Sequence, residues 1–229
     1  MNSETFVTVD GEGPPLVLVH GVGLDHTMWD RALDSLSAFR RVIRYDLLGH
    51  GQTPDSPGPR TLEDFVVQLL TVLDAHRLDR ADVAGLSLGG MVALAAAARH
   101  PGRFARLALL NTVFERSPEQ VASALRRMAI AESEGMAAVA DLAVDRWFSP
   151  QWQAKHPAQV DQIRRRLTDT DPVGYLKAYR VFIAGDHLMP EGATAVTATT
   201  LAMAGELDPG STPAMSRALA TAVPGGQVR

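Results

Sequence analysis

The segment Gly85-Leu86-Ser87-Leu88-Gly89 has the residue types and spacing that most directly indicate chemistry. It lies between an apolar run at residues 82–86, which predicts a buried strand, and an apolar segment at residues 88–100, which predicts a buried helix. A sharp turn from strand to helix exposes the serine hydroxyl, and the flanking glycines avoid collisions with neighbouring backbone. The new helix also directs its free N–H groups and positive dipole end toward this place. Ser87 is therefore the candidate nucleophile for acyl transfer.

A second glycine-rich turn, His20-Gly21-Val22-Gly23, follows the apolar run at residues 16–19. Glycine allows the backbone of this turn to approach the serine. We therefore expect the amides of Val22 and Leu88 to form the oxyanion-hole pair. Gly21 and Gly23 are expected to border the bound substrate. His20 is interpreted as a structural hydrogen-bonding residue, because it lies at a strand end in a tight turn.

The elements that must position these residues follow from the hydrophobic pattern. Short apolar runs alternate with longer segments of helical periodicity, which predicts a mostly parallel sheet with helices on both faces. In the helix expected at residues 62–77, apolar residues recur every three or four positions, and Thr61 with Asp64 suits its N-terminus. A short helix is expected at residues 28–36. The predicted strands are residues 16–19, 42–45, 82–86, 106–110 and 199–204.

Residues 117–183 interrupt the alternation, because they contain helix-like segments and no convincing strand. An insertion after a strand sits over the carboxyl ends of the strands, where ligands of open α/β sheets bind. We therefore predict a helical cap at residues 113–190, between a first part of the core at residues 1–112 and a second part at residues 191–229. The expected cap helices are residues 121–134, 136–148, 157–168 and 172–183.

Two further motifs accompany the turn at residues 20–23, the serine turn and the cap: Asp46-Leu47-Leu48-Gly49-His50-Gly51-Gln52-Thr53 and Ala204-Gly205-Glu206-Leu207-Asp208. Together, along nearly the whole chain, these motifs resemble the α/β-hydrolase superfamily. The implied fold class is α/β, with a mostly parallel central sheet, helices on both faces and a helical cap. In that superfamily the last of these motifs ends in the acid of the catalytic triad, so the resemblance implies that Asp208 orients the base.

Shorter phrases in and after the cap are similar to the 3-oxoadipate enol-lactonase branch of this superfamily. The phrases are Arg146-Trp147-Phe148-Ser149-Pro150, Asp171-Pro172-Val173-Gly174-Tyr175-Leu176 and the segment at residues 208–213. The resemblance implies hydrolysis of a small carboxylate-bearing lactone or ester without a cofactor or metal, and it offers arginines of the cap as carboxylate-binding residues. Trp147 is a candidate substrate-binding residue. Arg164, Arg165 and Arg166 are expected to face water, because Val160, Ile163 and Leu167 form the apolar stripe of their helix.

The resemblance also implies a catalytic histidine that follows the acid after one further strand. No histidine follows Asp208 in the sequence, and residues 224–229 resemble a turn and the first residues of that strand, after a helix at residues 211–222. We therefore expect a C-terminally truncated chain that lacks the final strand, the histidine loop and the closing helix, and is nearly inactive. The remaining histidines lie in loops or at helix ends, and His187 is not expected to replace the missing base.

Composition excludes several other classes of function. The net charge is −4, and the basic residues are scattered, so a nucleic-acid partner is not expected. There is no cysteine, hence no disulfide and no thiolate chemistry. No apolar run approaches the roughly 18 residues of a membrane span, and residues 1–13 do not resemble a signal peptide. We expect a cytoplasmic protein with a small-molecule substrate, and the oligomeric state is left open.

The sequence is compatible with three functions. The first is a serine-dependent hydrolase of a small ester or lactone that forms an acyl-enzyme on Ser87. The second is a carbon–carbon bond hydrolase or a cofactor-free lyase on the same scaffold, since a scaffold does not fix a substrate. The third is a non-catalytic protein whose capped pocket binds a small molecule.

Overall fold

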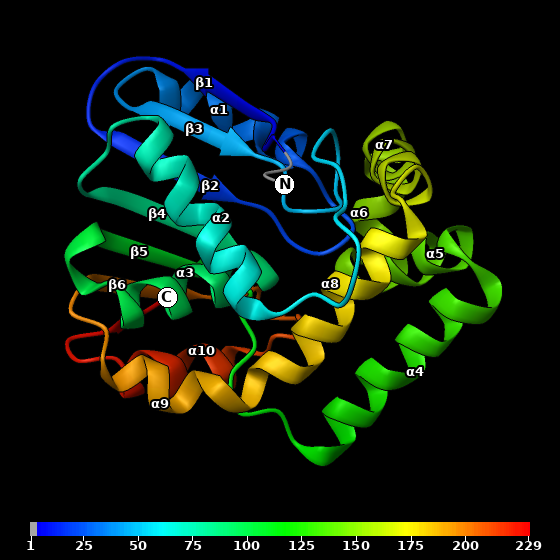
Figure 1. Ribbon diagram of the computed structural model, residues 1–229. Coiled ribbons are helices and arrows are strands. Elements are labelled where there is room, and N and C mark those ends of the chain that lie inside the picture. Colours follow the sequence, from blue (N-terminus) through cyan, green and yellow to red (C-terminus); the bar gives the residue numbers. More distant parts are fainter. Residues whose placement is uncertain (1–3) are drawn as a thin grey trace.

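The computed structural model describes residues 4–229, which form a twisted sheet with helices on both faces and a group of further helices at one end (Figure 1). The sheet has seven strands in the order β1-β3-β2-β4-β5-β6-β7. β1 pairs antiparallel with β3, and all other neighbouring pairs are parallel. The strands are β1 (Val7–Asp10), β2 (Pro15–Val19), β3 (Arg41–Tyr45), β4 (Ala81–Leu86), β5 (Phe104–Leu110), β6 (Thr199–Met203) and β7 (Gln227–Val228).

The helices are distributed unequally between the two faces of the sheet. One face is covered by the 3-10 helix η1 (His26–Trp29) and α1 (Asp30–Ser37), where Trp29 packs with Leu18 and Val42. The opposite face carries the larger core, with helices α2 (Leu62–Ala75), α3 (Leu88–Arg99), α9 (Met189–Thr194) and α10 (Pro213–Ala222). These positions confirm the expected α/β architecture with helices on both faces.

Helix α3 lies at the centre of the larger core. Every residue from Leu88 to Ala97 is buried, as its uniformly apolar sequence predicts. The helix ends before the 3-10 helix η2 (Pro101–Arg103), since proline cannot continue a helix. Its neighbour α2 begins with the expected capping box, in which Thr61 and Asp64 satisfy each other's backbone N–H groups.

Five helices form the group at the end of the sheet. They are α4 (Pro118–Glu134), α5 (Met136–Trp147), α6 (Pro150–Lys155), α7 (Pro157–Thr168) and α8 (Pro172–Ala184), followed by the 3-10 helix η3 (Gly185–Leu188). The four expected cap helices correspond to α4, α5, α7 and α8. The sequence did not predict α6, because six residues are too few to display a helical period.

Close backbone contact holds α8 against the core. A Cβ on Gly174 would collide with the carbonyl oxygen of Gly49, so both positions require the absence of a side chain. Nearby, Lys177 Nζ forms an ion pair with Asp55 and donates to the carbonyl of Ser56 at 2.8 Å. These contacts fix the position of α8 relative to the sheet.

The end of the described chain confirms the interpretation of residues 224–229. After α10 and a turn, Gln227 and Val228 pair parallel with Leu201 and Ala202 of β6. The Arg229 N–H continues the ladder by donating to Ala202 O at 3.1 Å. No helix in residues 4–229 has the length and hydrophobicity required to cross a membrane.

Candidate active site

Ser87 sits on a strained turn between β4 and α3. Its backbone has φ 55° and ψ −114°, a conformation that a non-glycine residue adopts only when its surroundings enforce it. The Ser87 N–H donates to Leu110 O on β5 at 2.8 Å. A Cβ on Gly85 would collide with the backbone of Gly89, and one on Gly89 would collide with the carbonyl of Val19. The glycines around Ser87 are thus required by the packing of α3 against the sheet.

The turn after β2 runs directly beside the serine. A Cβ built on Gly21 would lie 3.4 Å from the Ser87 Cβ. Among residues 4–229, neither the Val22 N–H nor the Leu88 N–H donates a backbone hydrogen bond, so both remain free to bind a developing oxyanion. Gly21 and Val22 line the cavity next to Ser87, whereas Leu88 is buried and contributes through its backbone only. Gly23 lies behind the cavity wall, where a Cβ would be 2.8 Å from Leu167.

Asp208 is held in the loop after β6 by three hydrogen bonds. Its Oδ1 accepts from the N–H groups of Gly210 at 2.8 Å and Ser211 at 3.0 Å. Its Oδ2 accepts from the side-chain Nδ2 of Asn111 at 2.6 Å. Asn111 follows β5 directly and has φ 45°, a left-handed conformation that asparagine tolerates better than most residues. The sequence analysis missed Asn111; its place directly after a strand was the only available signal.

The structure confirms His20 as a structural residue. It is fully buried, its Nδ1 contacts the carbonyl of Gly21 at 2.8 Å, and its Nε2 accepts from the Leu47 N–H at 2.9 Å. These partners require a neutral ring with the proton on Nδ1, and burial, aided by nearby His50, lowers the pKa of His20 well below its ordinary value. A ring with both nitrogens engaged in this way cannot accept the proton of Ser87.

One histidine–carboxylate pair, formed by His26 and Asp46, lies away from Ser87. His26 Nδ1 is 2.8 Å from Asp46 Oδ1, and Asp46 also accepts from the backbone N–H groups of His26 and Gln52. Asp46 is fully buried and fixes the loop that follows β3. Neither residue lines the cavity that contains Ser87. This pair therefore has a structural role in holding the loop after β3.

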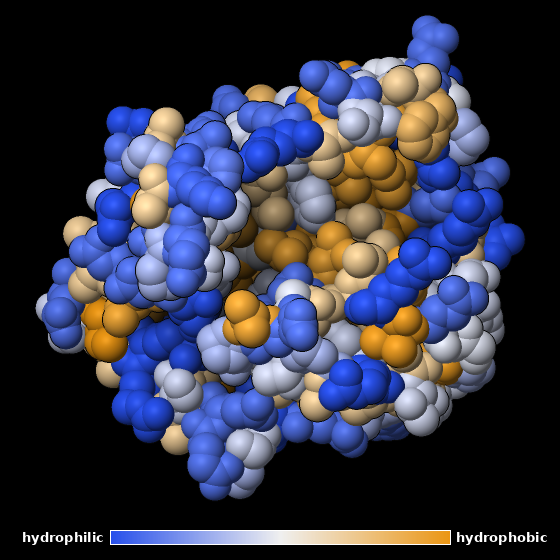
Figure 2. All heavy atoms as spheres, turned by 180° about the vertical axis from the view of Figure 1, so that it is seen from behind, coloured by the Kyte–Doolittle hydropathy of each residue, from blue (hydrophilic) through white to orange (hydrophobic). Residues whose placement is uncertain are grey.

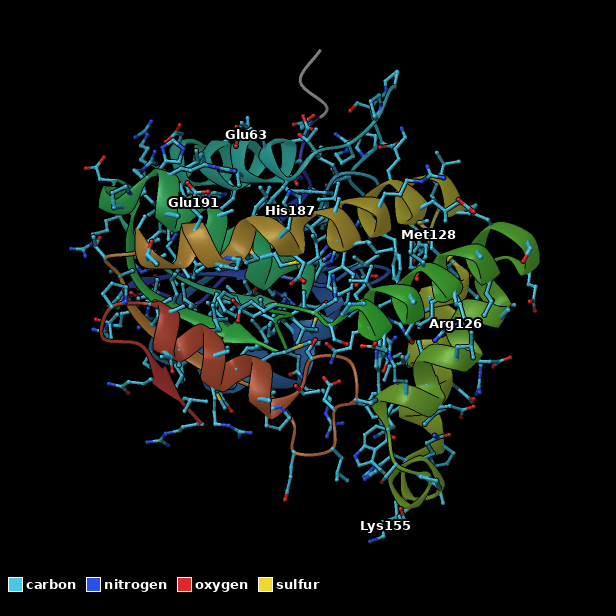
Figure 3. All side chains as sticks on the ribbon, turned by 90° about the horizontal axis from the view of Figure 1, so that it is seen from below. Glu63, Arg126, Met128, Lys155, His187 and Glu191 are labelled. Carbon is cyan, nitrogen blue, oxygen red and sulfur yellow. The ribbon has the colours of Figure 1, made fainter. Side chains whose placement is uncertain are left out.

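None of the histidines in residues 4–229 lines the cavity beside Ser87. His187 lies in η3, between α8 and α9, and is exposed (Figure 3). Its position agrees with the expectation that it does not act as the base. The described residues thus bring together the nucleophile, the free amides and the acid, without a histidine between them.

A cavity of about 1090 Å³ lies between the cap helices and the carboxyl ends of the strands, with Ser87, Asn111 and Asp208 in its wall. The molecule is visibly hollowed here, with a mainly hydrophobic floor and a hydrophilic rim (Figure 2). Most of the apolar lining comes from the cap: Val139, Trp147, Phe148, Pro150, Ile163, Leu167, Tyr175, Tyr179 and Phe182. The volume suits a small organic molecule.

The cap residues singled out from the sequence have different surroundings. Trp147 lines the cavity, and its side chain is partly exposed there. Arg164 pairs with Asp141 on the surface, and Arg165 is exposed, as expected. The expectation was wrong for Arg166, which lines the cavity and pairs with Asp25 at 3.3 Å. The ion pair with Asp25 holds the Arg166 side chain beside the cavity rather than in water.

A strained serine between a strand and a helix, with free amides beside it and a carboxylate after a later strand, is the arrangement typical of serine hydrolases of the α/β type. Comparison with known families agrees with this class. Residues 14–229 match the family described as alpha/beta hydrolase fold. The chain therefore belongs to the alpha/beta hydrolase fold family.

Individual relatives are similar over most of the chain. An (E)-2-((N-methylformamido)methylene)succinate hydrolase from Acinetobacter baylyi is 30% identical over 206 residues, which is 90% of this chain and 77% of the relative. A 3-oxoadipate enol-lactonase 1 from the same organism is 30% identical, over 87% of this chain and 73% of its own length. The crystal structure of an enol-lactonase from Burkholderia xenovorans superposes with a TM-score of 0.91 at 34% identity, over 98% of this chain and 86% of that chain. These similarities confirm the resemblance to the enol-lactonase branch.

Proposed function

We propose that the protein is a serine-dependent hydrolase that cleaves a small ester or lactone through an acyl-enzyme on Ser87. The observation that carries the proposal is the backbone of Ser87, whose strained φ of 55° aims the hydroxyl into the cavity beside two free amides. Strain of this kind persists only where the surrounding structure imposes it, and it is typical of functional sites. The names of the similar hydrolase and enol-lactonase support the same chemistry.

The reaction has two halves. Ser87 Oγ adds to the carbonyl carbon while its proton passes to a base, and the N–H groups of Val22 and Leu88 stabilise the resulting oxyanion. Collapse breaks the carbon–oxygen bond, and the leaving oxygen takes the proton from the base. A water molecule then adds to the acyl carbon and gives a proton to the base. The second collapse releases a carboxylic acid and returns the proton to Ser87, with no metal or cofactor required.

Asp208 is proposed as the group that orients the base. Its two oxygens are already occupied by backbone amides and Asn111, so its position in the loop is fixed before substrate binds. The residues of the described chain place no histidine beside it. In the superfamily that the chain resembles, a histidine after the acid acts as the base, and residues 209–229 contain no histidine.

The first test asks whether Ser87 is a nucleophile without depending on that histidine. The 229-residue chain is treated with a fluorophosphonate in increasing concentrations of imidazole, which supplies a base from solution. We expect one adduct by intact mass, located on Ser87 by peptide mapping, that forms faster as imidazole increases. Ser87→Ala should give no adduct.

Ser149→Ala is the matched control, because Ser149 lines the same cavity but caps α6. It should be labelled like the unaltered chain. Labelling of Ser87→Ala, or no labelling of the unaltered chain at any imidazole concentration, contradicts the proposal and favours a non-catalytic binder. In a catalytically active form of the protein, identification of the products distinguishes cleavage of an ester from cleavage of a carbon–carbon bond.

A further inference from the structure

The hydroxyl group of Tyr175 is a free hydrogen-bonding group in the wall of the cavity. Tyr175 lies in the first half of α8 and lines the cavity that contains Ser87. The residue is 5% exposed, yet its hydroxyl is not among the polar atoms that the protein encloses without a partner. Among residues 4–229 this hydroxyl forms no hydrogen bond. It therefore opens into the cavity, where it can bind a ligand.

The other two tyrosines of the chain do not offer such a group. The Tyr45 hydroxyl is enclosed in the larger core and has no partner among the described residues. The Tyr179 hydroxyl accepts a hydrogen bond from Arg127 Nε at 2.9 Å. Tyr175 is thus the tyrosine whose hydroxyl combines a place in the cavity with the absence of a partner among residues 4–229.

Packing on two sides fixes the ring of Tyr175. Tyr175 and Tyr179 are four residues apart and so lie on the same side of α8, where their rings stack with centres 5.4 Å apart. The edge of the Tyr175 ring lies against the turn after β2, because a Cβ on Gly23 would be 3.0 Å from Tyr175 Cε2. Cε2 is the ring carbon next to the one that bears the hydroxyl. A side chain held in this way loses little entropy when it binds a ligand.

The turn that contacts the Tyr175 ring also borders Ser87. A Cβ on Gly21, two residues before Gly23, would lie 3.4 Å from the Ser87 Cβ. Val22 lies between these two glycines, and its N–H donates no backbone hydrogen bond among residues 4–229. The nucleophile, the free amide of Val22 and the Tyr175 ring therefore meet at three consecutive residues of one turn.

The Tyr175 hydroxyl is suited to act as a donor. Burial raises its pKa and Tyr179 raises it further, while Arg146 and Arg127 act in the opposite direction. The hydroxyl therefore keeps its proton at neutral pH. A fixed donor in a cavity with a mainly apolar wall binds a developing negative charge more strongly than it binds a neutral carbonyl.

We propose that the Tyr175 hydroxyl donates a hydrogen bond to the carbonyl oxygen of the substrate, as a third donor beside the N–H groups of Val22 and Leu88. This role rests on the proposed function. The preceding residue, Gly174, contacts the backbone of Gly49, and this contact holds the hydroxyl at a fixed place above the sheet. The hydrogen bond strengthens as the oxyanion forms, so its loss slows acylation more than it weakens binding.

The first measurement separates binding of a reactive probe from the step that modifies Ser87. The 229-residue chain is treated with increasing concentrations of a fluorophosphonate at a fixed concentration of imidazole, and adduct formation is followed by intact mass. The phosphoryl oxygen of the probe takes the place of the substrate carbonyl oxygen. Tyr175→Phe, which removes only the hydroxyl, should lower the rate constant at saturation by about tenfold or more, because an oxyanion donor contributes about a hundredfold or more. The probe concentration that gives half of the maximal rate should stay unchanged.

Tyr45→Phe is the matched control, because it makes the same chemical change in the core and away from the cavity. It should react like the unaltered chain. Circular dichroism and urea denaturation should show that both variants remain folded.

The second measurement does not depend on the reactivity of Ser87. p-Nitrophenolate, an oxyanion with a visible absorption band, is titrated into Ser87→Ala and into the double variant Ser87→Ala with Tyr175→Phe. The loss of the hydroxyl should weaken p-nitrophenolate binding by about tenfold, as expected for a hydrogen bond to a charged group. Binding of p-nitroanisole, the neutral analogue, should stay unchanged.

The outcomes separate the donor role from the proposed function. Adduct formation at the same rate in Tyr175→Phe and in the unaltered chain overturns the donor and retains the nucleophile. A change in probe binding with an unchanged rate at saturation also overturns it, since Tyr175 would then only shape the cavity. If no adduct forms on Ser87 but p-nitrophenolate binding still depends on the Tyr175 hydroxyl, the hydrolase is removed and the oxyanion donor is retained.

Discussion

Asn111 Nδ2 lies 2.6 Å from Asp208 Oδ2, and this hydrogen bond joins the end of β5 to the loop after β6. The other oxygen of Asp208 is bound by backbone amides of its own loop. Asn111 is thus the only described side chain that donates to Asp208. It also holds a left-handed backbone conformation, with φ 45°. The candidate acid is positioned from two neighbouring strands at once.

This relationship predicts that Asn111→Gly impairs the orientation of the base without straining the backbone. A hydrogen bond to a charged group contributes about 1.5–3 kcal/mol, so kcat/KM should fall by about tenfold to a hundredfold. The measurement uses an extended chain, in which Arg229 is followed by the histidine-bearing segment implied by the resemblance to enol-lactonases. Asn111→Ala should show the same kinetic loss and a lower stability, because alanine adopts a positive φ less readily than glycine. An unchanged kcat/KM in Asn111→Gly would show that the contact has no positioning role.

The same extended chain tests whether a histidine in the added segment acts as the base. Removing the histidine of a serine hydrolase triad costs about a millionfold in rate, so adding a histidine in this position should raise p-nitrophenyl ester hydrolysis by several orders of magnitude. Changing the added histidine to alanine should return the rate to that of the 229-residue chain. His26→Gln should leave the rate of the extended chain unchanged, because His26 bonds Asp46 outside the cavity. A large loss in His26→Gln would instead transfer the base role to that residue.

The serine turn could be predicted from sequence because its determinants are local. Gly85 allows α3 to approach β4, Gly89 allows α3 to approach the end of β2, and both glycines lie within the motif that contains Ser87. The same holds for the strands of the parallel sheet, whose buried runs are continuous in sequence. The role of Asp208 as the acid was predicted from the resemblance alone, and the structure adds the hydrogen bonds that hold its carboxylate.

Local sequence could not predict that three arginines without a salt bridge among the described residues line the cavity. Arg116, Arg127 and Arg146 come from separate segments, and their proximity depends on how α4, α5 and α8 pack. Helical periodicity indicates which side of a helix is apolar, but not which charged residues meet across a cavity. The sequence analysis considered Arg164, Arg165 and Arg166 instead, because they are adjacent in the chain.

The packing of the serine turn predicts a stability difference between two glycines. A Cβ on Gly89 would collide with the carbonyl oxygens of Val19 and His20, whereas a Cβ on Gly102 would meet no atom within 4 Å. Gly89→Ala should therefore lower the free energy of unfolding by about 1–3 kcal/mol or more, since the collision is with backbone that cannot move freely. Gly102→Ala should change it by less than about 0.5 kcal/mol. Urea denaturation followed by circular dichroism measures both, and equal effects would show that α3 can move away from β2.

The buried histidines predict that stability falls as the solution becomes mildly acidic. Burial lowers the pKa of both His20 and His50, so near pH 6 the unfolded chain binds protons that the folded chain does not. Stability is therefore fully present above the unfolded pKa of about 6.5 and is lost as the pH falls below it, by up to about 1.4 kcal/mol per pH unit for each histidine. His76 has a lowered pKa as well and contributes in the same direction.

His50 provides the test, because its Nε2 is buried without a partner among residues 4–229, while its Nδ1 contacts the carbonyl of Leu48 at 3.2 Å. Replacing it with glutamine, which does not titrate, should reduce the loss of unfolding free energy between pH 7.5 and pH 5.5. The reduction should approach the contribution of one proton, about 1.4 kcal/mol. Urea denaturation at both pH values measures the difference, and His100→Gln, which replaces the C-cap residue of α3, serves as the comparison. If the pH dependence of His50→Gln equals that of the unaltered chain, His50 is not held neutral in the folded protein.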